Sequence, residues 1–265
     1  MTTIHANGID LYFERQGQGE PLLFISGSGA DLRNKPNQFD APIGENFDLI
    51  CYDQRGLGQS EKPSGEYSMA EYADDAAALL DYLEIDQIAV MGVSFGGMVA
   101  QEFALRHPSR VKHMVLACTS SGGPGRASYP LHELELLDED MRARQHLQIS
   151  DTRRDDSWVA QNPQRWEKLL GYALAARSSQ RDRVGALKQL EARKYHDTFD
   201  RLPQLTMPIL LVGGHYDGIA PVENMRAINT QLANSELRLY AGGHLFLVQD
   251  KRAYAEVVSW LKSQN

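Results

Sequence analysis

The sequence feature that most constrains the fold is the short segment Gly92-Val93-Ser94-Phe95-Gly96. An apolar run over residues 88–91 precedes it, and a helical pattern continues after it to Arg106. A buried strand that passes directly into a helix, with serine at the corner, is called a nucleophile elbow. The glycines have a steric reason, because so tight a turn leaves no room for a Cβ on either side of Ser94. The flanking patterns favour this elbow over an ordinary glycine-rich turn, and they place Ser94 beside a helix N-terminus, where negative charge is stabilised.

Short apolar runs recur along the chain and predict a mostly parallel sheet. Because polar and apolar residues do not alternate within them, both faces of each strand should be buried. Two further strands, 4–6 and 9–14, are joined at Asn7-Gly8, which is a hairpin signal. Helical patterns between the runs include a capping box at Ser68 and a last helix over 251–261, so we expect a doubly wound α/β fold. The runs cover residues 21–25, 47–52, 88–91, 111–118, 207–212 and 237–240.

The alternation of strands and helices stops after residue 118. From Ser120 to about Leu202 no convincing strand appears. Residues 120–125 form a loop, and helices are expected over 131–147, from Asn162-Pro163 onward, and over 181–195. This stretch is far longer than an ordinary connection between a helix and a strand. We therefore expect a helical cap, or lid, over residues 120–203, inserted into a core made of residues 1–119 and 204–265. The alternative is that these helices only cover one face of the sheet.

A serine nucleophile needs a base to take its proton and an acid to orient that base. Two predicted strands end at the sheet edge where Ser94 is expected, and they lead into Asp217 and His244. The chain order of serine, then aspartate, then histidine is the order expected in an α/β-hydrolase. His215 is a rival base, but it lies too close to Asp217 in the sequence for both to serve in one triad.

The negative charge that develops on the substrate oxygen needs hydrogen-bond donors. We expect the backbone N–H of Phe95 to be one donor, since Phe95 directly follows the nucleophile. Small residues in the loop Ser26-Gly27-Ser28-Gly29 allow close approach to a substrate, and we expect the backbone N–H of Ser28 to be the second donor. The alternative for this loop is a plain glycine turn.

The sequence resembles the α/β-hydrolase superfamily, close to its small esterases, enol-lactonases and methylesterases. This resemblance implies a sheet of about eight strands flanked by helices, a helical cap, and a mainly structural role for Asp53 and Arg55. The family usually has His-Gly after the third strand, whereas this chain has Ser26-Gly27, a change that keeps the backbone donors. The matching segments are residues 92–97, residues 53–60, Asp217 with Pro221, and Gly243-His244.

Composition and charge argue against several functions. A net charge of -8 and a pI near 5.5 argue against a nucleic-acid partner. The sequence shows neither a membrane-spanning apolar stretch nor a signal peptide, so we expect no membrane association and a cytoplasmic location. Cys51 and Cys118 lie in apolar runs and are expected to be buried reduced thiols. Cysteines and histidines do not occur at metal-ligand spacing, so we expect neither a metal nor an organic cofactor.

These features predict a serine hydrolase that cleaves small carboxylic esters through an acyl-enzyme intermediate. Two alternatives stay open: a lactone or C–C bond hydrolase with the same triad, and a ligand receptor with slow turnover. Apolar residues of the insertion predict a mainly apolar substrate pocket. Monomer and homodimer are both compatible with the sequence. The apolar residues are Leu134, Leu137, Trp166 and Leu170.

Overall fold

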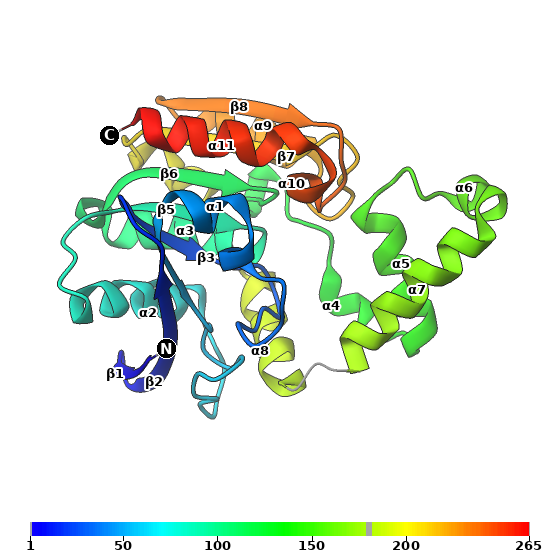
Figure 1. Ribbon diagram of the computed structural model, residues 1–265, viewed down its shortest axis with the longest axis horizontal. Coiled ribbons are helices and arrows are strands. Elements are labelled where there is room, and N and C mark those ends of the chain that lie inside the picture. The colour runs from blue at the N-terminus through cyan, green and yellow to red at the C-terminus, as the bar shows by residue number, and fades with distance from the viewer. Residues whose placement is uncertain (1, 179–181, 265) are drawn as a thin grey trace.

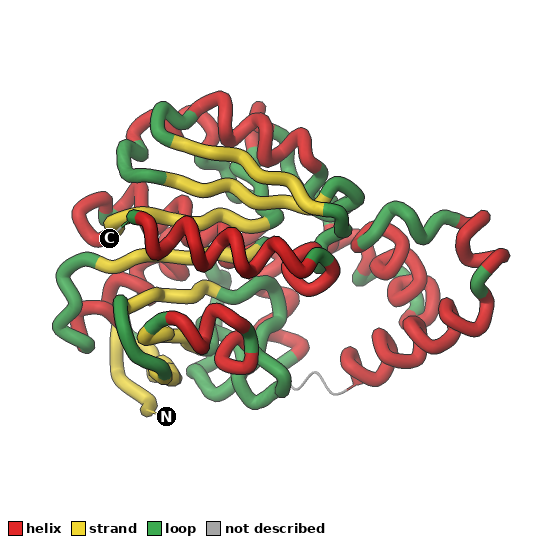
Figure 2. The backbone as a smooth tube through the Cα atoms, turned by 45° about the horizontal axis from the view of Figure 1, so that its top comes forward, coloured by secondary structure: helices red, strands yellow, loops and turns green. Residues whose placement is uncertain are grey.

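The computed structural model describes residues 2–178 and 182–264, and an eight-stranded sheet forms its centre (Figures 1 and 2). The strand order is β1-β2-β4-β3-β5-β6-β7-β8. Strand β2 pairs antiparallel with β1 and β4, and every other pairing is parallel. The prediction of a mostly parallel eight-stranded sheet is confirmed. The strands are β1 (Thr2–Ala6), β2 (Ile9–Gln16), β3 (Pro21–Ile25), β4 (Asp48–Tyr52), β5 (Ile88–Val93), β6 (Val111–Ala117), β7 (Ile209–Gly214) and β8 (Ser235–Tyr240).

Both faces of the sheet are buried, which explains the continuous apolar runs. Leu23 and Ile25 of β3 belong to a core shared with α2, α3 and α9, whereas Leu22 and Phe24 belong to a second core shared with α1 and α11. Successive side chains of a strand point to opposite faces, so each of the strands β2 to β7 supplies both cores. The helices that cover the sheet are α1 (Pro42–Asn46), α2 (Met69–Tyr82), α3 (Phe95–Arg106), α9 (Val222–Gln231), α10 (Phe246–Gln249) and α11 (Lys251–Ser263).

Two local signals of the sequence appear as expected. Asn7 and Gly8 both have positive φ, 48° and 75°, as a two-residue hairpin turn between β1 and β2 requires. The Ser68 side chain accepts the N–H of Glu71, and the Glu71 side chain accepts the N–H of Ser68, which forms the capping box of α2. None of the helices in the described residues is long and apolar enough to cross a membrane.

Five α-helices of the described residues lie between β6 and β7, and we call them the inserted helices. Figure 1 shows α5, α6 and α7 set apart to one side, whereas α8 lies close to the end of the sheet. The single helix expected over 131–147 is wrong, because Asp138 accepts the N–H of Met141 and starts a new helix after α4 has ended. Arg181, where the third expected helix begins, lies outside the described residues. The inserted helices are α4 (Leu131–Leu134), α5 (Glu139–Ser150), α6 (Asp156–Gln161), α7 (Pro163–Ser178) and α8 (Arg183–Lys194).

Helix α8 packs closely against the core. A Cβ at Gly185 would overlap the backbone oxygen of Gly56, so the two backbones touch without a side chain between them. Three residues later in the same helix, Lys188 donates to the carbonyl of Pro63 at 2.8 Å. Ala192, in the last turn of the same helix, is buried in the core that α2, α3 and α9 share with the sheet. The glycine at 185 is thus what permits the close approach of α8 to the sheet.

The variant Gly185→Ala should lower the free energy of unfolding by about 2 kcal/mol or more, because the added Cβ meets rigid backbone. Gly171 of α7 is a matched control, since a Cβ there would meet nothing within 4 Å. Gly171→Ala should raise the free energy of unfolding by about 0.5–1 kcal/mol through better helix propensity. Urea unfolding of the two variants measures both effects, and equal stability would contradict the close packing of α8.

His196 follows α8 and is buried against the loop after β6. Its Nε2 lies 3.2 Å from the carbonyl oxygen of Ser120, and a carbonyl only accepts, so Nε2 carries the hydrogen. Nδ1 is buried without a hydrogen-bond partner. Burial lowers the pKa of His196 to about 3, so the folded protein keeps this imidazole neutral in mild acid.

The wild-type protein should therefore lose stability as the pH falls below 6.5, since only the unfolded chain then binds a proton at His196. Between pH 7 and pH 5 this loss should be about 2 kcal/mol. The variant His196→Gln cannot take up that proton and should show a smaller decrease over the same range. Urea unfolding at both pH values measures the difference, and identical pH dependence in the two proteins would contradict the neutral buried imidazole.

Candidate active site

The turn between β5 and α3 has the geometry of a nucleophile elbow. Ser94 joins the two elements with φ 55° and ψ −116°, a strained conformation for a residue other than glycine. A Cβ at Gly92 would overlap the carbonyl oxygen of Gly96, and a Cβ at Gly96 would overlap that of Ile25. These contacts agree with the steric reason given for the two glycines.

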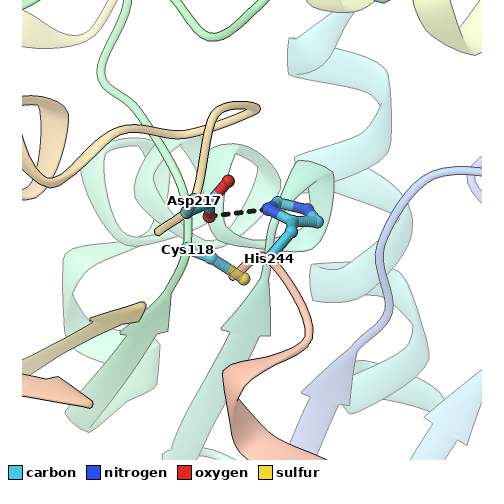
Figure 3. Close-up of side chains that lie close together, drawn as sticks. All are labelled: Cys118, Asp217 and His244. Atoms are coloured by element: carbon cyan, nitrogen blue, oxygen red, sulfur yellow. Dashed lines mark hydrogen bonds and ion pairs between the residues drawn. The ribbon is translucent and has the colours of Figure 1, made fainter. Parts of the chain in front are cut away.

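Ser94, His244 and Asp217 lie together in a chain of hydrogen bonds. Nε2 of His244 is 3.0 Å from Oγ of Ser94. Nδ1 of the same ring is 2.7 Å from Oδ2 of Asp217, and Figure 3 shows this second contact as a dashed line. The other carboxylate oxygen, Oδ1, accepts the backbone N–H groups of Ile219 and Ala220 at 2.8 and 2.9 Å. Because a carboxylate accepts from Nδ1–H, the lone pair of Nε2 faces the serine hydroxyl. The rival His215 is exposed and takes no part in this chain.

The acid and the base differ in their exposure. The side chain of Asp217 is fully buried, whereas 14% of the His244 side chain is exposed. A buried carboxylate keeps its hydrogen bonds to the imidazole without competition from water, while the imidazole stays within reach of a substrate. The arrangement can therefore move a proton from the Ser94 hydroxyl to His244.

One expected oxyanion donor, the N–H of Phe95, directly follows the nucleophile, and the loop that contains the other lies next to it. Phe95 is the first residue of α3, so its backbone N–H has no acceptor within the helix. A Cβ at Gly27 would lie 3.5 Å from the Cβ of Ser94, which places the loop that contains Ser28 next to the serine. The following N–H, that of Gly29, donates to Gln189 of α8 at 2.8 Å and fixes this loop to the inserted helices.

Residues 149–152, at the end of α5, lie across the two loops that carry the acid and the base. We call them the bracing segment. The carbonyl oxygens of Ile149 and Ser150 accept the backbone N–H groups of Gly218 and His244 at 2.9 and 2.7 Å. One insertion segment therefore holds the loop after β7 and the loop after β8 at a fixed separation.

Side-chain hydrogen bonds also connect the bracing segment to Gly243, the residue before His244. Gln249 accepts the N–H of Gly243 at 2.7 Å and donates to the buried Asp151 at 3.2 Å. A Cβ at Gly243 would overlap the carbonyl oxygen of Ser150, so glycine is needed for this approach. Sequence reasoning missed the bracing segment, and its only signal was a glycine beside each predicted triad loop, at 218 and 243.

A cysteine side chain lies beside Asp217 and His244. Cys118 follows β6 with φ 40°, and its Sγ, an oxygen of Asp217 and a ring nitrogen of His244 all lie within 4.8 Å of one another (Figure 3). Burial raises the pKa of the Cys118 thiol well above its usual value, and the nearby Asp217 charge raises it further. The prediction that Cys51 and Cys118 are free and buried is confirmed. The place of Cys118 beside the triad was missed, because these residues are far apart in the sequence.

A cavity of about 480 Å³ begins at Ser28 and extends between the core and the inserted helices. Of the four apolar residues expected around a pocket, Leu134 lines this cavity, whereas Leu137, Trp166 and Leu170 do not. Charged side chains join the apolar ones, so the cavity can hold both apolar and polar groups of a ligand. Its lining includes Leu57, Leu134, Leu190, Glu135, Arg142 and Asp182.

Comparison with known proteins agrees with this architecture. Residues 20–251 match the model of a family described as alpha/beta hydrolase fold. The chain is 30% identical over 241 residues to a poly(3-hydroxyalkanoate) depolymerase from Ectopseudomonas oleovorans, covering 90% of this chain and 82% of that protein. It is 27% identical over 259 residues to 3-oxoadipate enol-lactonase 2 from Acinetobacter baylyi, covering 97% and 94% of the two chains.

The fold also matches a solved structure over the whole chain. A meta-cleavage product hydrolase from Pseudomonas fluorescens superimposes with a TM-score of 0.80, covering 100% of this chain and 98% of the other. The two sequences are 22% identical, so this likeness shows the shared fold.

Proposed function

This chain belongs to the alpha/beta hydrolase fold family, and from that premise we propose that it hydrolyses carboxylic esters through an acyl-enzyme intermediate on Ser94. The observation that supports the proposal most strongly is the pair of hydrogen bonds, 3.0 and 2.7 Å long, that joins Ser94 to His244 and His244 to Asp217. Serine hydroxyls become effective nucleophiles when a base so placed takes their proton.

In the first half of the reaction, His244 removes the hydroxyl proton as Ser94 Oγ bonds to the carbonyl carbon of the ester. The backbone N–H groups of Phe95 and Ser28 hold the oxygen that becomes negative. Asp217 keeps the imidazole oriented and stabilises its positive charge. When the tetrahedral intermediate collapses, the bond to the alcohol breaks and His244 returns the proton to the departing oxygen.

In the second half, a water molecule attacks the acyl group on Ser94. His244 takes the proton of this water and then donates it to Oγ as the acyl bond breaks. The products are the free acid and the regenerated enzyme. No residue in this sequence of steps needs a metal or an organic cofactor.

We further propose that the inserted helices form a cap over this site and supply its substrate pocket. The cavity that begins at Ser28 supports this role, because a substrate acyl or alcohol group bound there would lie beside one oxyanion donor. The hydrogen bond between Gly29 and Gln189 connects the cap to the same loop. The mixed lining favours a small ester that has both apolar and polar groups.

Hydrolysis of a lactone is the second candidate, and the similarity to 3-oxoadipate enol-lactonase 2 favours it. A lactone is a cyclic ester, so the same steps apply and the alcohol product stays attached to the acid. The triad geometry therefore accommodates both reactions, and the shape of the pocket decides between them.

A substrate panel tests the proposal directly. It contains p-nitrophenyl esters of increasing acyl length, enol-lactones and β-diketones, each assayed for steady-state kcat/KM. We expect saturable turnover of at least one ester or lactone, with kcat roughly in the range 1–10³ s⁻¹. Negligible turnover of the whole panel, combined with a large ligand-dependent rise in melting temperature, would favour a receptor instead.

A further inference from the structure

Three potential metal ligands converge at the carboxyl ends of neighbouring strands. Cys118 follows β6, Asp217 follows β7 and His244 follows β8, and their ligand atoms lie within 4.8 Å of one another (Figure 3). We propose that a thiophilic divalent cation such as Zn²⁺ or Cd²⁺ binds these three side chains and reversibly switches the hydrolase off.

The geometry requires only small movements. Zinc bonds to sulfur at about 2.3 Å and to nitrogen or oxygen at about 2.0–2.2 Å, so ligand atoms in a tetrahedral site lie roughly 3.5 Å apart. No separation in this group exceeds 4.8 Å, so the longest must shorten by at most about 1.3 Å. The Nδ1 and Oδ2 atoms, 2.7 Å apart, must separate slightly to admit the ion.

The carboxylate is already oriented for this role. Oδ1 of Asp217 is held by the backbone N–H groups of Ile219 and Ala220, which leaves Oδ2 directed at the histidine. An ion between Oδ2 and Nδ1 would take the place of the hydrogen that now joins them. The Cys118 sulfur is the third ligand, and water completes the coordination.

Binding releases one proton to solvent, from the Cys118 thiol, since metals bind the thiolate. The hydrogen on Nδ1 of His244 moves to Nε2, because the metal binds the neutral imidazole through an unprotonated ring nitrogen, and neither oxidation nor reduction takes place. With its hydrogen on Nε2, the imidazole has no lone pair that can take the proton of Ser94. The bound ion therefore blocks the first step of ester hydrolysis.

The donor set determines the class of ion. A thiolate and an imidazole favour Zn²⁺ and Cd²⁺, whereas Mg²⁺ and Ca²⁺ prefer sites made entirely of oxygen. The cysteine is thus the selective ligand, and its removal should weaken binding of Zn²⁺ about tenfold or more. Mg²⁺ should have no effect on the hydrolase at the same concentrations.

The test compares the wild-type protein with Cys118→Ala, Cys118→Ser and Cys51→Ala. Cys51 is a matched control, because it is also free and buried but lies on β4 in the core with α1 and α11. Each protein is titrated with ZnCl₂, CdCl₂ or MgCl₂, and ester hydrolysis is expressed relative to its own rate without metal. Absorbance of the cadmium–thiolate bond in the ultraviolet is recorded in parallel.

We expect Zn²⁺ and Cd²⁺ to inhibit the wild type and Cys51→Ala, with reversal by EDTA. Both Cys118 variants should need about tenfold more metal or higher, and should lack the cadmium–thiolate band. Equal inhibition of all four proteins, or no inhibition of the wild type, would overturn the proposal. The inhibition arm rests on the proposed ester hydrolysis, whereas the cadmium band tests the site even if no ester is hydrolysed.

Discussion

Replacing Ser94 with alanine should lower kcat for a p-nitrophenyl ester by roughly 10⁵–10⁶-fold. The variant lacks the only oxygen that lies within hydrogen-bond distance of Nε2 of His244 in the triad, so no acyl-enzyme can form. The oxyanion donors are backbone groups and remain in place, which leaves a small residual rate. Steady-state kinetics with an active-site titration of the wild type measure the loss.

The fold of this variant should be unchanged, because Ser94 makes no side-chain cap to α3. Ser157→Ala, an exposed serine of α6, serves as the control and should keep the wild-type rate. If Ser94→Ala retained a rate within tenfold of the wild type while melting at the same temperature, the nucleophile would have to be a different residue.

Replacing Asp217 with asparagine should lower kcat by about 10⁴-fold. The amide oxygen can still accept the N–H groups of Ile219 and Ala220, so the loop after β7 keeps its shape. The amide NH₂ would then face Nδ1 of His244 and could only donate to it. That contact forces the hydrogen onto Nε2, and the imidazole can no longer accept the proton of Ser94.

The size of the fall in kcat shows whether Asp217 orients the base or is an ordinary carboxylate of the loop. The same variant should bind a substrate-like inhibitor normally, since Asp217 is fully buried and does not line the cavity at Ser28. A fall in kcat of less than tenfold would mean that another group orients His244. Measurement of kcat and of inhibitor affinity on one preparation distinguishes the two outcomes.

The sheet and the meeting of Ser94, Asp217 and His244 at one edge of it could be predicted because both are encoded locally. Strands buried on both faces give unbroken apolar runs, and the six parallel-sheet runs were each found within a few residues of their true ends. In a parallel sheet the carboxyl ends of strands meet at one edge, so three strand-end residues could be brought together without knowing the fold in detail. The glycines at 92 and 96 added a steric requirement, since a Cβ at either position would overlap a backbone oxygen.

Features that depend on contacts between distant segments could not be predicted. The bracing segment makes backbone hydrogen bonds to two loops, and backbone groups carry no residue-specific signal. Cys118 looked like any buried thiol, because the side chains around it come from two later strands. The break between α4 and α5 was missed, since the Asp138 cap lies inside an otherwise continuous helical pattern.

The central claim is that the hydroxyl of residue 94 is activated by the imidazole of residue 244. A fluorophosphonate reacts covalently with such a serine, and mass spectrometry of the digested protein locates the adduct. We predict one adduct per chain on the peptide that contains Ser94, slower labelling of Asp217→Asn, and none at this position in Ser94→Ala. Stoichiometric labelling of another residue, or an unreactive wild-type protein, would contradict the account.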